Sequence, residues 1–153
     1  MSGAGAPKLQ IDASDLQVAI VVTSWHTNIT DGLLAGAERA LKAAGNSEYE
    51  IWRVPGAFEL PLGTQYAIDA GADAVIALGV VIQGDTPHFD YVCSAATDGL
   101  NRVQLDSGIP VGFGLLTVNT EQQALDRAGL PGSKEDKGAE AVEAAVLMAR
   151  LRA

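Results

Sequence analysis

The sequence predicts an α/β fold in which a parallel sheet is covered by helices on both faces. Short runs rich in Val, Ile and Ala alternate with longer segments whose apolar residues recur at three- and four-residue steps. The run at residues 74–82 is apolar almost throughout, as expected of a strand buried on both faces. Strands that alternate with helices are joined by right-handed crossovers, and these produce a parallel sheet.

The first strand is predicted at residues 17–23, and the first helix at about residues 28–44. Gly45 follows this helix, and glycine commonly ends helices because it adopts the left-handed conformation freely. The apolar residues of the helix share one face, which should pack on the sheet. They are Ile29, Leu33, Ala37, Ala40, Leu41 and Ala44.

The second strand is predicted at residues 49–54, followed by a turn and a helix that begins near Ala57. Pro61 is compatible with this helix only because it lies in the first turn, where its missing N–H costs no hydrogen bond. Gly71 closes the helix, and the apolar run at residues 74–82 is the third strand.

The fourth strand is predicted at residues 110–117. Thr120 and Gln123 have the spacing of a capping box, which opens a short helix that ends near Gly129. A polar loop follows, and Asp136 or a neighbour begins an Ala-rich final helix. The apolar face of that helix comprises Val142, Ala145, Val146 and Ala149.

The chain has 153 residues, which suits one domain with a single core, here residues 1–153. Residues 1–12 are expected to form a flexible tail. Within it, residues 9–12 have the pattern of a short edge strand that can pair with a neighbouring subunit.

The composition narrows the range of partners and compartments. A net charge of −9 argues against binding to nucleic acid or to an anionic membrane surface. The single cysteine, Cys93, permits no internal disulfide and suits a reducing compartment; we expect it to fill space in its helix. No apolar run approaches the roughly 20 residues of a membrane span. We therefore expect a cytoplasmic protein.

The segment after the third strand carries the clearest functional signal. Gly84 and Pro87 break the backbone after residue 82, and helix spacing resumes at Phe89, Val92, Ala96, Leu100 and Val103. Loop amides, the Thr86 hydroxyl and a helix N-terminus converge there and suit an anion. His88 adds a group that titrates near neutrality. An ordinary strand–helix turn with a surface histidine would show the same spacing.

Several motifs in register resemble the lumazine synthase family. They include Gly84-Asp85-Thr86-Pro87-His88-Phe89-Asp90-Tyr91-Val92, Val54-Pro55-Gly56-Ala57-Phe58-Glu59-Leu60-Pro61, Gly114-Leu115-Leu116-Thr117, Glu121-Gln122-Gln123-Ala124-Leu125-Asp126-Arg127-Ala128-Gly129 and Lys137-Gly138-Ala139-Glu140-Ala141. The resemblance covers nearly everything between Val18 and Leu151.

The resemblance implies a flavodoxin-like three-layer α/β/α sandwich with four parallel strands. It also implies the condensation of 5-amino-6-(D-ribitylamino)uracil with 3,4-dihydroxy-2-butanone 4-phosphate. The product is 6,7-dimethyl-8-ribityllumazine, an intermediate of riboflavin synthesis, and phosphate and water are released. These steps need no metal and no redox cofactor, and the chain shows neither a metal-ligand set nor a dinucleotide-binding motif.

The resemblance also assigns site residues. His88 is implied as the group that transfers protons during imine formation and elimination. The pyrimidine substrate is implied to contact Trp25 by stacking, Glu59 through its ribityl hydroxyls or amine, and Phe113 from the adjacent subunit. The other implied pyrimidine-binding residues are Ala57, Phe58, Val80, Val81, Ile82 and Lys137.

The phosphate group is implied to lie on Gly84, Asp85 and Thr86 and to be gripped by Arg127, whose planar guanidinium suits bidentate binding. A cation such as Arg127 is also favoured near the C-terminal end of any helix, whatever its function.

The other assigned side chains have ordinary explanations as well. Trp25, Phe58 and Phe113 can be core residues, Glu59 can offset a helix dipole, and Lys137 can be a solvated loop cation. His26 has no motif behind it and is interpreted as a surface polar residue.

One position departs from the family: Gln83 stands where many members carry Arg. Two alternative functions therefore remain open. One is a flavin- or lumazine-binding protein that kept the pocket and lost turnover, and the other is an assembly scaffold.

The family implies a homo-oligomer with active sites at subunit interfaces, either a ring of five subunits or an icosahedral shell of such rings. Residues 130–136 form a longer loop than that of shell-forming relatives, and the loop contains Pro131. A bulky loop at the ring–ring contact favours the free homopentamer.

Overall fold

The computed structural model describes Gly5 and residues 10–152. Its sheet has four parallel strands in the order β2-β1-β3-β4. The strands are β1 (Val18–Thr23), β2 (Glu50–Val54), β3 (Ala74–Ile82) and β4 (Val111–Val118). The predicted α/β class and all four predicted strands are confirmed.

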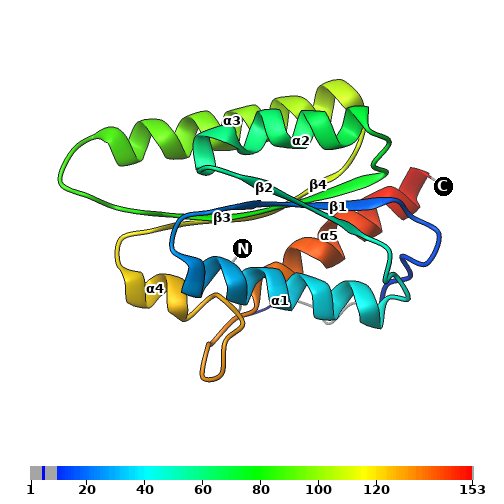
Figure 1. Cartoon of the computed structure of the whole chain (residues 1–153), viewed down its shortest axis with the longest axis horizontal. Coiled ribbons are helices and arrows are strands. Elements are labelled where there is room, and N and C mark those ends of the chain that lie inside the picture. Colours follow the sequence, from blue (N-terminus) through cyan, green and yellow to red (C-terminus); the bar gives the residue numbers. More distant parts are fainter. Residues whose placement is uncertain (1–4, 6–9, 153) are drawn as a thin grey trace.

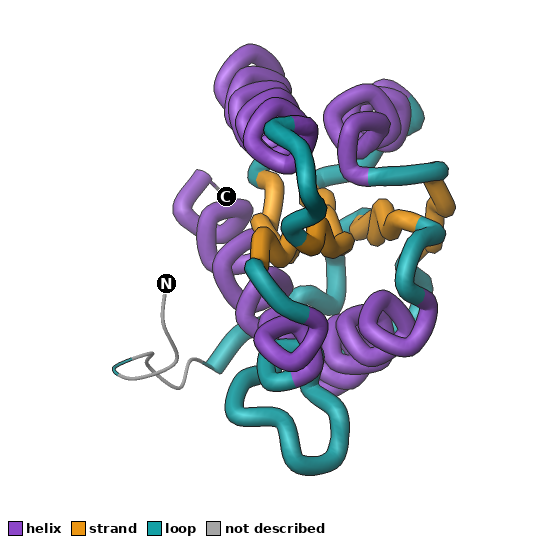
Figure 2. Tube along the Cα trace, turned by 90° about the vertical axis from the view of Figure 1, so that its left-hand side faces the viewer, coloured by secondary structure: helices purple, strands orange, loops and turns teal. Residues whose placement is uncertain are grey.

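Helices cover both faces of the sheet, so the protein has three layers (Figure 1; Figure 2). A 3₁₀ turn, η1 (Ala57–Glu59), leads into α2 (Leu60–Asp69), which lies beside α3 (His88–Ser107) on one face. The opposite face carries α1 (Thr27–Ala43), the short α4 (Glu121–Leu125) and α5 (Lys137–Arg152). The carboxyl ends of all four strands therefore meet at one edge of the molecule.

The two faces of the sheet bury separate sets of apolar side chains, because successive residues of a strand point to opposite sides. Ile20 and Ile76 pack under α1 and α5, together with Leu33 and Val142. Val21 belongs to the second core, under α2 and α3. β1 is buried along its whole length, as expected of a central strand.

The glycine signals at the ends of α1 and α2 operate as predicted, whereas the predicted capping box of α4 forms only in part. Gly45 and Gly71 follow α1 and α2 with φ angles of 85° and 108°, which only glycine adopts at little cost. Thr120 caps α4 by accepting a hydrogen bond from the backbone N–H of Gln123 at 3.2 Å. The amide oxygen of Gln123 accepts from the Asn119 N–H instead of the Thr120 N–H that a capping box would use.

The short helix α4 ends at Leu125, and the prediction that it continues to near Gly129 is wrong. The Asp126 carbonyl accepts hydrogen bonds from the backbone N–H groups of Lys134 and Glu135, at 2.8 and 2.9 Å. Gly129 N–H donates in turn to the Glu135 carbonyl at 3.0 Å. The chain therefore folds back on itself after α4, through a loop that projects from the lower layer in Figure 1.

The predicted strand at residues 9–12 begins outside the described part of the chain, and residues 10–12 form no helix or strand. Within Gly5 and residues 10–152, no helix has the length and apolar character needed to cross a membrane.

Candidate functional site

A cavity of about 690 Å³ opens where β1, β2 and β3 end. Its position agrees with the general rule that ligands of open α/β sheets bind beyond the carboxyl ends of the strands. Its lining residues are Trp25, His26, Gly56, Ala57, Phe58, Glu59, Val80, Val81, Ile82, His88, Tyr91 and Val92. All except Ala57 and Val80, which are buried, are exposed or half-buried in the single chain.

Eight residues that the sequence resemblance assigns to the site share this cavity: Trp25, Ala57, Phe58, Glu59, Val80, Val81, Ile82 and His88. They come from segments after β1, after β2, at the end of β3 and at the start of α3. The fold thus brings together residues that are more than sixty positions apart in the printed sequence.

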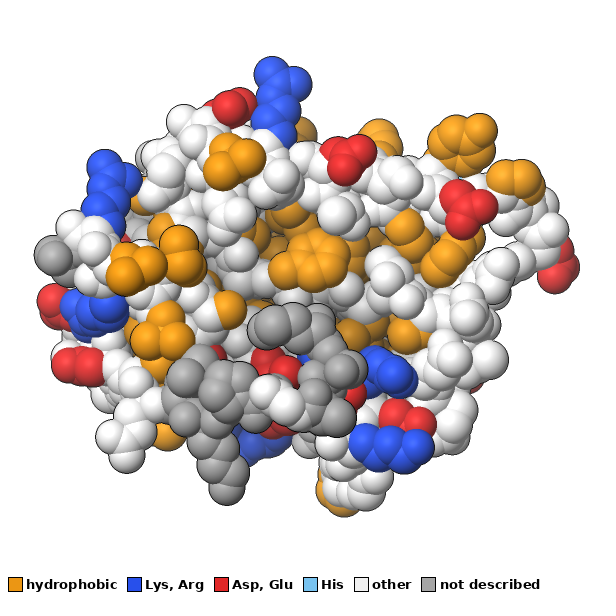
Figure 3. Space-filling view, turned by 180° about the vertical axis from the view of Figure 1, so that it is seen from behind, with side chains coloured by type: hydrophobic (Ala, Val, Ile, Leu, Met, Phe, Trp, Pro, Cys, Tyr) orange, Lys and Arg blue, Asp and Glu red, His pale blue; other side chains and the backbone are white. Residues whose placement is uncertain are grey.

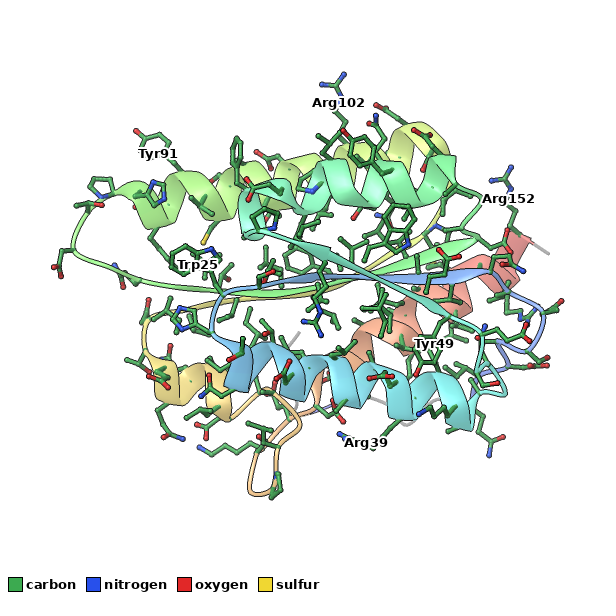
Figure 4. The ribbon with its side chains drawn as sticks, in the orientation of Figure 1. Trp25, Arg39, Tyr49, Tyr91, Arg102 and Arg152 are labelled. Atoms are coloured by element: carbon green, nitrogen blue, oxygen red, sulfur yellow. The ribbon has the colours of Figure 1, made fainter. Side chains whose placement is uncertain are left out.

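The aromatic side chains at the cavity are not core residues. Trp25 is 66% exposed and Phe58 is 65% exposed, so the alternative in which they pack in the interior is wrong. Trp25 lies beyond the end of the sheet, between the two helical layers, and Tyr91 points outward from α3 (Figure 4). Exposed aromatic faces beside a cavity are suited to stacking against a planar ring.

Glu59 is fixed within the cavity by the turn that precedes it. Its Oε1 accepts a hydrogen bond from the Gly56 N–H at 2.9 Å, and its own N–H donates to the Gly56 carbonyl at 3.1 Å. A Cβ added to Gly56 would lie 3.5 Å from the Trp25 indole. The same Cβ position lies 3.4 Å from Glu59 Oε1, so the carboxylate and the indole both lie on the side of Gly56 that a side chain would occupy.

The loop between β3 and α3 is exposed and has few internal contacts. It is anchored where Gln83 N–H donates to the Val118 carbonyl at 2.9 Å. The Thr86 hydroxyl accepts from the His88 N–H at 3.4 Å. No atom lies within 4 Å of the position of a Cβ on Gly84, and its φ is not positive. Neither packing nor backbone conformation within the described chain requires glycine there, whereas a close-lying ligand would.

His26 was missed by the sequence analysis, which treated it as a surface polar residue. It lines the cavity next to Trp25, and it is the one residue other than glycine with a positive φ (54°) within Gly5 and residues 10–152. The left-handed conformation costs a non-glycine residue about 1–2 kcal/mol. No local sequence motif signals this conformation, although histidine is among the residues that tolerate it.

Three predicted site residues, Phe113, Arg127 and Lys137, do not line the cavity. Phe113 does not lie at the carboxyl end of its strand, where the cavity opens. It is the third residue of β4 and pairs with Ala77 in the middle of β3. Its side chain is 50% exposed and faces α3, beside Thr97 and Asn101.

Arg127 lies two residues beyond α4 and not in its last turn as predicted. One guanidinium N–H nevertheless donates to the Gln123 carbonyl at 2.8 Å, so the side chain does satisfy a carbonyl at the helix end. The Arg127 carbonyl accepts from the Lys137 N–H at 3.0 Å, which joins the start of α5 to the end of α4.

Lys137 is the first residue of α5, so its interpretation as a solvated loop cation is wrong. Its side chain is 15% exposed, and Nζ lies 3.2 Å from Glu135 and 3.3 Å from Glu140. Arg127 and Lys137 both lie on the face of the sheet that α1 and α5 cover, whereas Phe58, Tyr91 and Val92 border the cavity on the α2–α3 side.

Cys93 is half-buried on α3, and burial together with the nearby Asp90 carboxylate raises the pKa of its thiol. This favours the thiol form and agrees with a packing role. No group of three or more His, Cys, Asp or Glu residues suited to a metal ion occurs in the described part of the chain.

Comparison with known proteins identifies the family. A family model described as 6,7-dimethyl-8-ribityllumazine synthase matches residues 15–153. A protein of that name from Leifsonia xyli subsp. xyli is 62% identical over 151 residues, which cover 97% of this chain and 95% of the relative.

Two further relatives carry the same name. The protein from Kineococcus radiotolerans is 61% identical over 146 residues, covering 95% of this chain and 91% of the relative. The protein from Clavibacter michiganensis subsp. michiganensis is 60% identical over 154 residues, covering 99% and 96%. The fold, the cavity at the strand ends and these full-length matches agree, and the chain belongs to the 6,7-dimethyl-8-ribityllumazine synthase family.

Proposed function

We propose that the cavity at the ends of β1, β2 and β3 is the active site at which this enzyme of riboflavin biosynthesis forms its lumazine. The observation that carries the proposal is the meeting of Trp25, the 56–59 turn, residues 80–82 and His88 around one space. The amine of 5-amino-6-(D-ribitylamino)uracil condenses there with the ketone of 3,4-dihydroxy-2-butanone 4-phosphate. This condensation forms an imine and releases one water. The imine then eliminates phosphate, and the ribitylamino nitrogen closes the ring on the remaining carbonyl with loss of a second water.

The pyrimidine occupies the apolar part of the cavity. Trp25 offers an exposed indole face for stacking, and Phe58 offers a second aromatic surface. Ala57, Val80, Val81 and Ile82 supply the remaining apolar walls. Glu59, held by the Gly56 N–H, presents its second carboxylate oxygen to the hydroxyl or amine groups of the substrate.

The phosphate of the second substrate lies against the loop of Gly84, Asp85 and Thr86. The absence of side-chain contacts around Gly84 supports a close approach of the anion to the backbone. The loop leads directly into α3, whose first-turn N–H groups favour a negative charge. His88 is the first residue of this helix and transfers protons to and from the reacting atoms, which is worth about 10²–10⁴-fold in rate.

Holding the two substrates in register is the larger contribution. Proximity and orientation can lower the barrier by about 7–11 kcal/mol, and none of the residues involved has to provide a redox or Lewis-acid centre. The reaction accordingly needs no added metal or redox cofactor.

The complete site includes residues of a neighbouring subunit. Phe113, Arg127 and Lys137 do not line the cavity of their own chain, and the sheet separates Arg127 and Lys137 from its α2–α3 side. In the proposed oligomer, Phe113 closes the pyrimidine pocket of the neighbour, with Lys137 close by. Arg127 grips the phosphate that lies on the neighbour's 84–86 loop.

Exposed apolar surface supports this assembly. Leu105, Phe113 and Met148, on α3, β4 and α5, are each at least half exposed. Figure 3 shows hydrophobic side chains gathered across the face on which β4 is the edge strand. On the opposite edge, Ile51, Leu62 and Tyr66 of β2 and α2 are also exposed. Two different apolar edges suit the head-to-tail contacts of a closed ring.

The direct test is to mix the two substrates with purified protein and a chelator and to measure phosphate release. Release that requires both substrates supports the proposal. Release that is absent, or that continues without the pyrimidine, contradicts it. A protein that binds riboflavin or lumazine without releasing phosphate would be the binding protein considered above, and one that does neither would be a scaffold.

The shared site has a test of its own. His88→Ala and Arg127→Ala each disable a different half of the proposed site. Co-assembly of the two variants from denatured, mixed subunits should restore some interfaces that carry both wild-type residues, and hence part of the activity. Mixing without recovery would place both residues in the same half-site.

The proposal treats residues 1–153 as one domain with a tail at residues 1–12. It also places the protein in the cytoplasm, in keeping with its single half-buried cysteine.

A further inference from the structure

The cavity contains one polar side chain to which the reaction outlined above gives no role. His26 lines it beside Trp25, in the short segment between β1 and α1, and is exposed in the single chain. Its backbone has φ 54° and ψ 63°, a left-handed conformation that side-chain-bearing residues avoid. The conformation turns the chain sharply between the strand and α1.

The backbone of His26 has an evident structural purpose, but its side chain does not. The carbonyl accepts hydrogen bonds from the N–H groups of Ile29 and Thr30, at 2.9 and 3.0 Å, and so begins α1. Glycine or asparagine would make the same bonds at a lower conformational cost. The imidazole itself makes no capping hydrogen bond to α1. The start of α1 therefore does not explain why this residue is histidine, and its place in the cavity wall offers another explanation.

Among the side chains that line the cavity, few can donate a hydrogen bond to a substrate hydroxyl, and an imidazole can. The substrate's ribityl chain carries hydroxyl groups, each of which donates and accepts hydrogen bonds. Glu59 can only accept when ionised, and one of its oxygens is already bonded to the Gly56 N–H. His88 is engaged at the phosphate end, and Tyr91 points away from the sheet (Figure 4). A neutral imidazole offers one donor and one acceptor, the same pair that a hydroxyl needs.

We propose that His26 is a specificity-determining residue that hydrogen-bonds the ribityl hydroxyls of the pyrimidine substrate, next to Glu59. The inference rests on the proposed pyrimidine site. It assigns His26 to recognition of the polyol chain and not to the chemical steps, because His26 follows Trp25 in the chain and lines the same cavity as Glu59. The left-handed backbone belongs to a residue at the wall of this cavity, where recognition of a substrate can offset its conformational cost.

The experiment compares two non-reacting pyrimidines in which a nitro group replaces the 5-amino group. One carries the ribityl chain, and the other carries a straight alkyl chain of the same length. Their dissociation constants are measured by calorimetry for the parent protein and for His26→Ala, His26→Gly and His26→Asn. Glycine removes the side chain and relieves the backbone, so a loss of binding in both the Ala and the Gly variants is not a folding defect.

Both truncations should weaken the ribityl compound about tenfold, the effect of losing one good hydrogen bond, and should leave the alkyl compound unchanged. Asparagine, which tolerates the left-handed conformation and has both a donor and an acceptor, should retain most of the affinity. Asn28→Ala is the matched control, since Asn28 is an exposed residue of α1 that does not line the cavity. It should change neither constant.

An equal loss of affinity for both compounds would show that His26 shapes the pocket without hydrogen-bonding the ribityl hydroxyls, and this would overturn the inference. Unchanged binding of the ribityl compound in the Ala and Gly variants would overturn it as well. Phosphate release by the parent protein tests the active site independently, so the failure of His26 as a recognition residue is distinguishable from failure of the proposed function.

Discussion

The carboxylate of Asp136 lies against the Cα of Gly36, so close that a Cβ atom added to this glycine would overlap Oδ1. Oδ2 of the same carboxylate is 3.1 Å from a guanidinium nitrogen of Arg39, and Oδ1 accepts from the Ala139 N–H at 3.2 Å. Asp136 therefore joins α1 to the start of α5. Because the Lys137 N–H follows directly and bonds the Arg127 carbonyl, this contact also sets the position of the loop that bears Arg127.

The first prediction is that Gly36→Ala destabilises the protein by about 1–3 kcal/mol, because the new methyl group displaces the Asp136 carboxylate. The measurement is the free energy of unfolding in urea. Helix propensity alone predicts the opposite sign, since alanine is favoured over glycine by about 1 kcal/mol inside a helix. A Gly36→Ala variant more stable than the parent would thus contradict the contact.

Asp136→Asn is the matched control for that experiment. It keeps the size of the side chain and a hydrogen-bond acceptor for Ala139, and removes only the charge that faces Arg39. The Arg39 side chain is 58% exposed, so the ion pair should contribute less than about 1 kcal/mol.

The second prediction is that Arg127→Ala raises the KM for the butanone phosphate much more than the KM for the pyrimidine. The reason is the loss of a charge-assisted contact to the phosphate, which contributes about 1.5–3 kcal/mol. Steady-state kinetics with each substrate varied in turn measure the two constants. Arg127→Lys should recover part of the loss, and equal effects on both substrates would refute the assignment of Arg127 to the phosphate.

The sequence predicts those elements of this structure whose bounds are set by residues close to them in the chain. The strand β3 and the helix α1 were predictable because an apolar run, a 3.6-residue periodicity and Gly45 all act within a few residues. The end of α4 was not, because it is set by backbone bonds from Lys134 and Glu135, which lie eight or more positions away. No helix-end signal at Asp126 reveals such bonds.

The site shows the same division. Trp25 and His88 lie in or at the end of the segments that follow β1 and β3, so a rule about strand ends predicts that they meet. His26 adjoins Trp25 but was missed, since its cavity position depends on a left-handed backbone that its sequence context does not encode. The predicted strand at residues 110–117 contains Phe113, but the sequence does not give the register in which Phe113 pairs with Ala77 of β3.

The third prediction is that Trp25 stacks on the bound heterocycle, so riboflavin or a lumazine analogue quenches tryptophan emission. Trp52 is half-buried on β2, with its indole N–H 3.1 Å from Glu50, and supplies a background signal. Trp25→Phe retains an aromatic ring for binding but removes the fluorophore. Most of the quenching should disappear in this variant; quenching of undiminished amplitude would exclude stacking at position 25.

The fourth prediction concerns alkaline stability. Burial, together with the adjacent Glu38 carboxylate, raises the pKa of Tyr49 to about 12 from its ordinary value near 10. The folded protein thus holds this proton more tightly than the unfolded chain does. The stability linked to it is fully present below about pH 10 and is lost as the pH rises towards 12.

Tyr49→Phe should therefore reduce the fall in unfolding free energy over this pH range, as measured by urea unfolding at several pH values. Tyr66→Phe, at an exposed position on α2, is the control and should leave the pH profile as it is in the parent. If both variants have the parent's profile, Tyr49 is not the group responsible.

The last prediction is that the protein is a homopentamer and does not form an icosahedral shell. The half-exposed Phe113 and the separation of Arg127 from the cavity argue that a monomer has incomplete sites. The loop that follows α4 projects from the layer of α1 and α5 (Figure 1), and Pro131 and Gly132 are exposed in it.

Hydrogen bonds within the loop at residues 126–136 hold its conformation. The Ser133 hydroxyl accepts from the Leu130 N–H at 3.0 Å, and Lys134 and Glu135 bond the Asp126 carbonyl. A rigid projection at the surface where rings meet in shell-forming relatives would keep rings apart. Light scattering on the purified protein measures the mass directly. A mass many times that of five subunits, as an icosahedral shell would have, would overturn the argument from the loop. A stable monomer that retains activity would overturn the shared site as well.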